Sequence, residues 1–552
     1  LMEDPKKRVV INKDVCEGCG DCSVQSNCVS IEPLETELGR KRKINQSNCN
    51  KDYSCIKGFC PSFVTVDAEI KNNTKFKDLG ELPEPQYKTN QDINNIMLTG
   101  IGGTGVLTIS AILAYAAHYE GKDSSVLDMT GLAQKGGAVW SHIKIFEKNN
   151  KPYSQKISPG SANVLLACDG VVGTKPEIQE VISKEKTITV LNSNTIPVAD
   201  FITQRDIDFK NNDVFQMLKN TTKNIISNIP AISISEKLSG DAIGTNMLML
   251  GSAYQNGLIP LKAENIFKAI ELNGIGVERN LYNFNLGRLY TINPSHEIFS
   301  FLSENEVKEL NSVELFEDRL DRIKNYDHKV VGSFKKDKNL IDLILSEEAD
   351  TENITKDAIR ELYRVYAIKD EYEVARMHLE STSKILDNTF NSWKNLKFYL
   401  SPPIISFLKD KRTQRPIKIA IPGYIAMPIF KLLKSMKFLR GTFIDPLSFT
   451  QDRRQDKEHK EIFRNKLMEI NNLITGAKSK KLSELIDASK EVKGYGPVRA
   501  KSYESFKSRI NFTSKKRSRV LSNIFSFKTK SNIQAKSYKT PKEKGQNDKS
   551  FR

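Results

Sequence analysis

Seven of the eight cysteines of this 552-residue chain lie in one short segment, between Cys16 and Cys60. The eighth, Cys168, stands alone. Disulfide-built proteins are usually small and secreted, whereas a dense cysteine segment in a large chain is typical of metal or cluster binding in a reducing compartment. We therefore expect this segment to fold around a metal centre, in a cytoplasmic protein.

Three of these cysteines, Cys16, Cys19 and Cys22, have the spacing C-x2-C-x2-C. This triplet is the bacterial ferredoxin pattern, whereas zinc ribbons use two separated C-x-x-C pairs. In two-cluster ferredoxins the fourth ligand is a distant cysteine followed by proline. The one such pair here is Cys60-Pro61. The pattern predicts a [4Fe–4S] cluster on Cys16, Cys19, Cys22 and Cys60.

The other cysteines of the segment, Cys28, Cys49 and Cys55, are one thiol short of a second four-cysteine site. Three interpretations stay open for them. They could hold a three-iron cluster, complete a second cluster with a non-cysteine ligand, or be structural.

A glycine-rich loop follows the cysteine-rich segment. A short apolar strand at 96–99 is expected to run into the loop and then into a helix over 106–119; the loop glycines are Gly100, Gly102, Gly103 and Gly105. Asp128 closes the next expected strand, about where a dinucleotide-binding fold has its ribose-binding acid. The motif alone therefore indicates an NAD or FAD site, although a helix N-terminus of this kind holds other anions as well.

With its cysteine-rich segment and its glycine-rich loop, the chain resembles the indolepyruvate ferredoxin oxidoreductase family. This family belongs to the thiamine-diphosphate-dependent 2-oxoacid:ferredoxin oxidoreductases. The matching stretches are residues 15–22, 39–45, 57–63, 100–105 and 128–137. Their order is shared with the family as well as their motifs. Five more stretches resemble a strand and a helix of the family's gamma domain and its helical C-terminal domain: 163–169, 270–274, 369–376, 439–446 and 493–498.

The resemblance implies a multidomain fold that combines α/β and α regions. The expected parts are a ferredoxin-like iron–sulfur domain (1–70), a linker (71–92), a Rossmann-like parallel-sheet gamma domain (93–295), a mainly helical domain of uncharacterised role (296–510) and a disordered basic tail (511–552). The sheet pattern of the gamma domain is expected to close at 289–294.

Enzymes of this family use thiamine diphosphate to decarboxylate a 2-oxoacid such as indolepyruvate. They pass the electrons singly through iron–sulfur clusters to ferredoxin and give the acyl group to coenzyme A. The resemblance thus implies an electron path through the four predicted cluster ligands. It also implies a set of loop residues that face the thiamine or coenzyme A region: Gly100, Gly102, Gly103, Gly105, Gln134, Lys135 and Gly136. It assigns no catalytic residue to this chain.

The thiamine site itself has no counterpart in this sequence. The stretch Cys168-Asp169-Gly170 lacks the first glycine and the following asparagine of the G-D-G…N site for diphosphate and magnesium. We therefore expect thiamine diphosphate and Mg²⁺ to be bound by domains upstream of Leu1, and this chain to be inactive alone. The expected partners are those domains, ferredoxin and a second copy of the enzyme in a homodimer.

Charge and hydropathy point to few other partners. The formal charge is +17, but residues 501–552 hold 15 Lys and Arg against 3 Asp and Glu, so most of it lies in the tail. The weakly polar stretch 419–430 is too short to cross a bilayer and contains prolines. A membrane or nucleic-acid partner is not expected. The alternative to an oxidoreductase is a noncatalytic iron–sulfur scaffold whose tail binds nucleic acid.

Two further features are expected to be structural. Cys168 ends an apolar strand and is interpreted as a buried thiol. The alternating charges of residues 369–376 are interpreted as an ion-pair face, either solvated or between domains.

Overall fold

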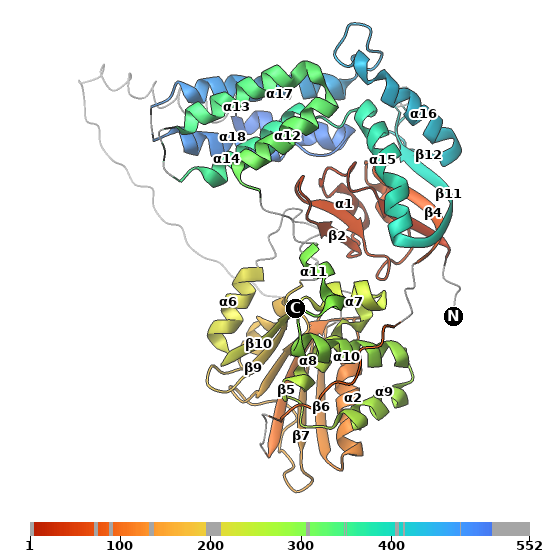
Figure 1. Ribbon diagram of the computed structural model, residues 1–552, viewed down its shortest axis with the longest axis vertical. Coiled ribbons are helices and arrows are strands. Elements are labelled where there is room, and N and C mark those ends of the chain that lie inside the picture. The colour runs from red at the N-terminus through yellow and green to blue at the C-terminus, as the bar shows by residue number, and fades with distance from the viewer. Residues whose placement is uncertain are drawn as a thin grey trace, which may run out of the picture.

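The computed structural model describes residues 5–70, 76–87, 92–131, 137–194, 211–304, 310–346, 348, 350–402, 408–411, 414–474 and 476–510. The predicted tail (511–552) and the loop residues Gln134, Lys135 and Gly136 lie outside this range. The described residues form two lobes (Figure 1). We call them the α/β lobe (76–304) and the cysteine lobe (5–70 with 310–510). None of the described helices has the length and hydropathy to span a membrane.

The cysteine-rich segment is built from short elements around a small core. They are β1 (Lys7–Ile11), α1 (Asp21–Ser26), β2 (Ile31–Leu34), β3 (Lys41–Ile44), the 3-10 turn η1 (Ser54–Lys57) and β4 (Phe63–Ile70). Strands β1 and β4 are antiparallel, and β2 pairs with β3 as a hairpin. The core contains four of the cysteines themselves, Cys16, Cys22, Cys55 and Cys60.

The α/β lobe contains one six-stranded sheet. Its strands are β5 (Ile93–Ile101), β6 (Asp123–Thr130), β7 (Ala138–Phe146), β8 (Val164–Ala167), β9 (Ile188–Asn192) and β10 (Asn224–Ile229). The spatial order is β10-β9-β8-β5-β7-β6. The first four strands in this order are parallel, whereas β7 is antiparallel to both of its neighbours. The sheet is therefore mixed, with a parallel half and a β6–β7 hairpin at one edge.

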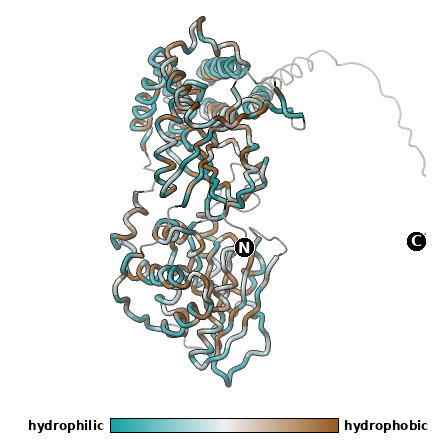
Figure 2. The backbone as a smooth tube through the Cα atoms, turned by 90° about the vertical axis from the view of Figure 1, so that its right-hand side faces the viewer, coloured by the Kyte–Doolittle hydropathy of each residue, from teal (hydrophilic) through white to brown (hydrophobic). Residues whose placement is uncertain are grey.

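Helices cover both faces of this sheet. The helical elements are α2 (Val106–Tyr119), α3 (Gly170–Gly173), α4 (Pro176–Gln179), α6 (Asn211–Thr221), α7 (Ala231–Ser239), η2 (Ala242–Gly244), α8 (Thr245–Gln255), α9 (Ala263–Asn273), α10 (Val277–Ile292), η3 (Glu297–Phe299) and α11 (Phe301–Glu304). Helices α2 and α7 to α10 contribute to the main core, and α4 and α6 to a second core on the other face. Figure 2 shows both lobes from the side, with apolar stretches inside each of them.

Two expectations for this lobe need correction or addition. The sheet pattern expected to close at 289–294 is instead the end of helix α10, because an apolar run at a helix end looks like a buried strand in the sequence. The predicted linker is packed where it is described. Phe76 stacks on Tyr282 with ring centroids 4.5 Å apart, and Arg288 forms an ion pair with Glu84 at 3.2 Å.

The rest of the cysteine lobe is mainly helical, as predicted. Its elements are α12 (Ser312–Tyr326), η4 (His328–Val330), α13 (Val331–Leu345), α14 (Glu352–Tyr366), α15 (Glu371–Thr389), β11 (Phe390–Leu400), β12 (Ile419–Pro422), α16 (Gly423–Ser435), η6 (Met436–Leu439), α17 (Gln451–Asn471) and α18 (Lys478–Lys490). Residues 496–510 are helical as well. Helices α12, α13, α14, α17 and α18 share one apolar core as a bundle.

Strands β11 and β12 join this part to the cysteine-rich segment. They extend the sheet of β1 and β4 in the order β1-β4-β11-β12. Phe398 of β11 pairs with Val64 of β4, and α15 and α16 supply the other side of the core. The N-terminal cysteine-rich segment and the C-terminal region therefore fold around a common sheet, as Figure 1 shows at upper right.

Candidate functional site: two cysteine groups and a glycine-loop cavity

The structure brings Cys16, Cys19, Cys22 and Cys60 together, and we call them the first cysteine group. The thiol of Cys19 is within electrostatic reach of Cys60, Cys22 and Cys16. Cys16, Cys22 and Cys60 are buried, and Cys19 is half-buried. Burial is the main cause that raises the pKa of Cys60 to about 12, and it raises the pKa of Cys19 and of Cys22 as well. Metal binding at these thiols would therefore release protons.

Local backbone geometry points amides at the sulfurs of this group. The N–H of Gly18 donates to Cys16 Sγ at 3.3 Å, and the backbone N–H of Asp21 hydrogen-bonds to the thiol of Cys19. Gly18 has φ 69°, and a Cβ there would lie 2.2 Å from a carbonyl oxygen. Only glycine fits such a position. Gly58 packs against the backbone of Cys22, where a Cβ on Gly58 would lie only 2.8 Å from the Cα of Cys22. The absence of a side chain at Gly58 therefore lets the chain bring Cys60 against α1.

Cys28, Cys49 and Cys55 form a second cysteine group. The thiol of Cys55 is within electrostatic reach of Cys49 and Cys28. Burial first, and then these neighbours, raise the pKa of Cys55 to about 12. Cys28 and Cys49 are half-buried, and the N–H of Lys51 donates to Cys49 Sγ at 3.4 Å.

The donor set of the first group fits an iron–sulfur cluster. All eight cysteines are free thiols. Within the described ranges, no three His, Cys, Asp or Glu side chains converge closely enough to hold one metal ion. A four-iron cluster binds each thiolate through a different iron atom, so it needs four thiols spaced more widely than a mononuclear site does. Four thiols that lie within electrostatic reach of one another, with an N–H donor at the sulfurs of Cys16 and Cys19, meet that need.

Two buried cations, Lys41 and Arg42, and one half-buried cation, Lys418, lie near these thiols. Lys418 lies near Cys60, Asp21, Cys55 and Cys22, and its ammonium donates to the carbonyl oxygen of Gly58. Burial lowers the pKa of Lys418 to about 8. On the other side, Lys41 lies near Cys16 and Arg42 near Cys22.

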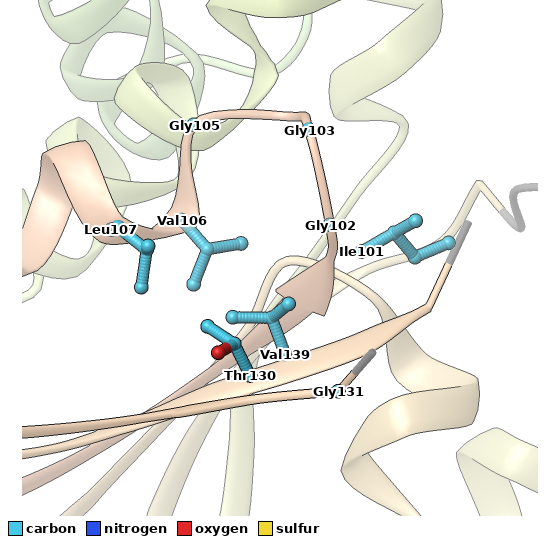
Figure 3. Close-up of a pocket in the computed structure, with 9 residues that line it drawn as sticks. All are labelled: Ile101, Gly102, Gly103, Gly105, Val106, Leu107, Thr130, Gly131 and Val139. Carbon is cyan, nitrogen blue, oxygen red and sulfur yellow. The ribbon is translucent and has the colours of Figure 1, made fainter. Parts of the chain in front are cut away.

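The glycine loop lines a cavity of about 300 Å³. Gly102, Gly103 and Gly105 contribute to its wall, together with Ile101, Val106, Leu107, Thr130, Gly131 and Val139 (Figure 3). Gly103 and Gly105 have φ values of 86° and 89°, and a Cβ on Gly103 would meet open space. Gly100 has another role. It lies in β5, where a Cβ would be 2.5 Å from Val106, so it lets the helix pack on the strand.

The described residues at the two ends of the second glycine-rich stretch, Gly131 and Gly137, lie beside this loop. The N–H of Gly102 donates to the carbonyl oxygen of Gly137 at 2.7 Å, and Gly131 lines the cavity. These are the described residues on either side of the predicted site residues Gln134, Lys135 and Gly136. The loop after β5 and the connection from β6 to β7 thus meet at one end of the sheet.

Asp128 does not have the position of a ribose-binding acid. Its strand β6 is the edge strand, and β7 separates it from the glycine-loop strand β5. A dinucleotide-binding fold places the acid on the strand next to the glycine loop. Here the Asp128 carboxylate accepts hydrogen bonds from Ser141 Oγ at 2.5 Å and Ser110 Oγ at 3.1 Å. The topology therefore argues against the NAD or FAD interpretation.

Sequence reasoning missed several residues around these sites. Asn246 of α8 donates to the carbonyl oxygen of Thr104 at 2.8 Å and supports the glycine loop from a distant helix. Lys418 and Tyr495 approach the first cysteine group from the C-terminal region. Tyr495 lies in the stretch 493–498 that resembles the family, so that motif was a usable signal. Lys418 lies in no motif.

The structural roles predicted for two features are confirmed. Cys168 is buried, with 2% of its surface exposed. Residues 369–376 do form ion pairs, both between regions and within α15: Lys369 with Glu17 at 3.1 Å, and Arg376 with Glu373 at 2.6 Å.

The α/β lobe combines a mixed six-stranded sheet, helices on both faces and a glycine-loop cavity. Residues 95–290 match the family described as pyruvate ferredoxin/flavodoxin oxidoreductase. Residues 335–511 match a family of unknown function (DUF6537).

Curated relatives agree with this assignment. The chain is 28% identical over 177 residues to the indolepyruvate oxidoreductase subunit IorB of Archaeoglobus fulgidus, covering 32% of this chain and 83% of that protein. It is 26% identical over 198 residues to IorB of Pyrococcus horikoshii, covering 35% and 93%. Among solved structures it is similar to the gamma subunit of a keto/oxoacid ferredoxin oxidoreductase from Geobacter sulfurreducens, with 21% identity, a TM-score of 0.24, and 36% and 98% of the two chains covered. The family match and the two IorB relatives confirm the resemblance to 2-oxoacid:ferredoxin oxidoreductases.

Proposed function

We propose that this chain is the gamma and electron-transfer portion of a 2-oxoacid:ferredoxin oxidoreductase that acts on an aryl pyruvate such as indolepyruvate. The family match of residues 95–290 and the IorB relatives support the reaction class. The observation that carries the electron-transfer part is the first cysteine group. The triplet Cys16, Cys19 and Cys22 meets Cys60, which follows η1, in the same chain as the part that matches an oxidoreductase family.

The first cysteine group would hold a [4Fe–4S] cluster, which supplies one-electron transfer when bound. The role of the chain is to hold the four thiolates, to donate N–H groups to their sulfurs and to keep water from them. Both hydrogen bonds to sulfur and exclusion of solvent set the potential of such a centre. The second cysteine group is a further place for a cluster, with the three interpretations given above.

The glycine-loop cavity is proposed to face the thiamine or coenzyme A region. Gly102, Gly103 and Gly105 line the cavity, and the stretch with Gln134, Lys135 and Gly136 continues from Gly131 beside it. Ligands of open α/β sheets bind at loops that follow the carboxyl ends of parallel strands, and β5 ends at this loop. Gly100 is assigned to packing only.

The rest of the reaction requires partners. Thiamine diphosphate and Mg²⁺ would be held by a separate thiamine-binding portion, coenzyme A would be a co-substrate, and ferredoxin would accept the electrons. We propose that the complete enzyme is a homodimer in the cytoplasm.

The test is an anaerobic assay of ferredoxin reduction with indolepyruvate and coenzyme A. The chain alone should give no reduction, and the chain joined to its thiamine-binding portion should give reduction that is faster with indolepyruvate than with pyruvate or 2-oxoglutarate. Replacing Lys135 or Gln134 with alanine should lower turnover, and Lys122→Ala, on the turn after α2, is the control. Reduction by the chain alone, or a complete enzyme that prefers 2-oxoglutarate, would contradict the proposal.

A further inference from the structure

The first cysteine group is enclosed by the domain that matches a family of unknown function. Residues 335–511 belong to that family, and the cysteines lie near the other end of the chain. Five side chains of this domain contact the chain around Cys16, Cys22 and Cys60: Lys369, His378, Arg415, Lys418 and Tyr495.

On one side, two of these residues hold the chain at Cys16 and after Cys60. The Lys369 ammonium donates to the carbonyl oxygen of Cys16 at 2.9 Å and pairs with Glu17. His378 Nε2 lies 3.0 Å from the carbonyl oxygen of Pro61. Both carbonyl groups belong to the segments that position the predicted cluster ligands.

Two cations, Arg415 and Lys418, hold helix α1 and the loop before Cys60. Arg415 binds the carboxylate of Asp21, with distances of 2.9 and 3.1 Å from one guanidinium nitrogen to the two oxygens. The same carboxylate accepts the N–H of Phe59 at 2.7 Å. The Lys418 ammonium donates to Gly58, the residue that packs on the backbone of Cys22.

Over Cys19, the cover is formed by main chain and an aromatic ring. A Cβ on Gly494 would lie 3.3 Å from the Cβ of Cys19, so the backbone passes directly over that residue. The hydroxyl of Tyr495 donates to the carbonyl oxygen of Val15 at 2.6 Å, and its ring packs in the core that contains the cysteines. The shared sheet fixes this arrangement, because β11 pairs with the strand that follows Cys60.

We propose that the domain of unknown function completes the iron–sulfur site. Its Gly494–Tyr495 segment closes the first cysteine group at Cys19, which is left only half-buried, and its half-buried Lys418 ammonium is a positioning charge near both cysteine groups that makes the cluster easier to reduce. Reduction adds a negative charge, which a nearby, half-buried cation stabilises. The effect of Lys418 on the reduction potential of the cluster rests on the proposed function, whereas the closure by Gly494 and Tyr495 does not.

Closure is tested on metal-free, reduced protein by pulsed alkylation of its thiols, read for each cysteine by mass spectrometry. In Tyr495→Ala we expect Cys19 to react about tenfold faster than in the wild type, because local opening then exposes it. Cys49, half-buried in the second group, and Cys168, in the other lobe, are internal controls and should keep their rates.

An unchanged rate at Cys19 would overturn the closure. If Cys49 or Cys168 also reacts faster, Tyr495→Ala has lost its fold, and Tyr495→Phe replaces it. That variant keeps the ring and loses only the hydrogen bond to Val15, so a selective rise at Cys19 is again expected, and no rise again overturns the closure.

The charge effect is tested on anaerobically purified, cluster-containing protein by redox titration followed by electron paramagnetic resonance. Lys418→Met should keep the iron and sulfide content. It should shift the ratio of oxidised to reduced cluster about tenfold toward oxidised at a fixed potential, which is about 59 mV for one electron. Lys409→Met, an exposed neighbour, is the matched control.

Equal midpoint reduction potentials in Lys418→Met and the wild type would overturn the role of the Lys418 charge. Wild-type protein without iron and sulfide would instead contradict the proposed function and would remove the role of the charge with it. The alkylation result would still decide the closure.

Discussion

Helices α8 and α10 cross at two glycines, and this crossing supports the glycine loop. A Cβ on Gly287 would lie 1.9 Å from the carbonyl oxygen of Leu248, and one on Gly251 would lie 1.9 Å from that of Phe284. Each obstructing atom is main chain and cannot rotate away. Gly287→Ala therefore forces the two helices apart.

The expected cost follows from two opposing effects. Restoring ordinary contact requires the helices to separate by more than an ångström, and overpacking of this kind costs about 1–3 kcal/mol. The higher helix propensity of alanine returns up to about 1 kcal/mol. Because the clash is with main chain, we take the upper end of this range for the overpacking cost. The expected net loss of stability is then about 2 kcal/mol. Asn246 on α8 should then hold Thr104 less firmly.

Amide hydrogen exchange followed by mass spectrometry measures this effect locally. Peptides of α8 and α10 should exchange about 30-fold faster in Gly287→Ala, which corresponds to 2 kcal/mol of opening free energy. Gly332→Ala is the control, since that glycine lies in α13 with open space around its Cβ position. It should stabilise its helix by about 0.5 kcal/mol. If the α8 and α10 peptides of Gly287→Ala exchange their amide hydrogens at the wild-type rate, the reasoning is refuted.

Two further predictions concern buried charge in the cysteine lobe. Arg440 binds the fully buried carboxylate of Asp370 at 2.6 and 3.0 Å, and Arg453 pairs with the same carboxylate. Because Arg453 remains as a partner, Arg440→Met should cost about 2 kcal/mol in urea unfolding followed by circular dichroism, and an unchanged midpoint would contradict this. Burial lowers the pKa of His378 to about 4, so the unfolded chain takes up its proton first, near pH 6.5. Stability should therefore fall by up to about 3 kcal/mol between pH 6.5 and 4. His378→Gln should flatten this pH dependence, and an equal slope in both proteins would argue against it.

Local patterns allowed a close prediction of the glycine loop and its flanking elements. Helix α2 spans the predicted Val106–Tyr119, because Gly105 supplies the left-handed residue from which the helix starts. Residues 163–169 contain β8, the fourth strand of the lobe along the chain, as predicted. The cysteine triplet also meets Cys60, because its spacing constrains one tight loop.

What could not be predicted depends on long-range pairing. Strand β7 lies between β5 and β6, so Asp128 has the expected sequence position without the expected neighbour. Nothing in the local sequence indicates that β11 pairs with β4, more than 300 residues away. Lys418 illustrates the same limit, since its place beside the cysteines depends on that shared sheet.

The measurement that tests the central claim most directly is the iron and acid-labile sulfide content of anaerobically purified protein, compared with Cys60→Ser and Cys168→Ser. For the wild type and Cys168→Ser we predict about four irons with equal sulfide, or seven to eight if the second cysteine group is also filled, and a paramagnetic signal on reduction. Cys60→Ser should lose the signal of the first group and its iron. Zinc without sulfide in the wild type, or a Cys60→Ser protein with an unchanged cluster, would contradict the assignment of the cluster to Cys16, Cys19, Cys22 and Cys60.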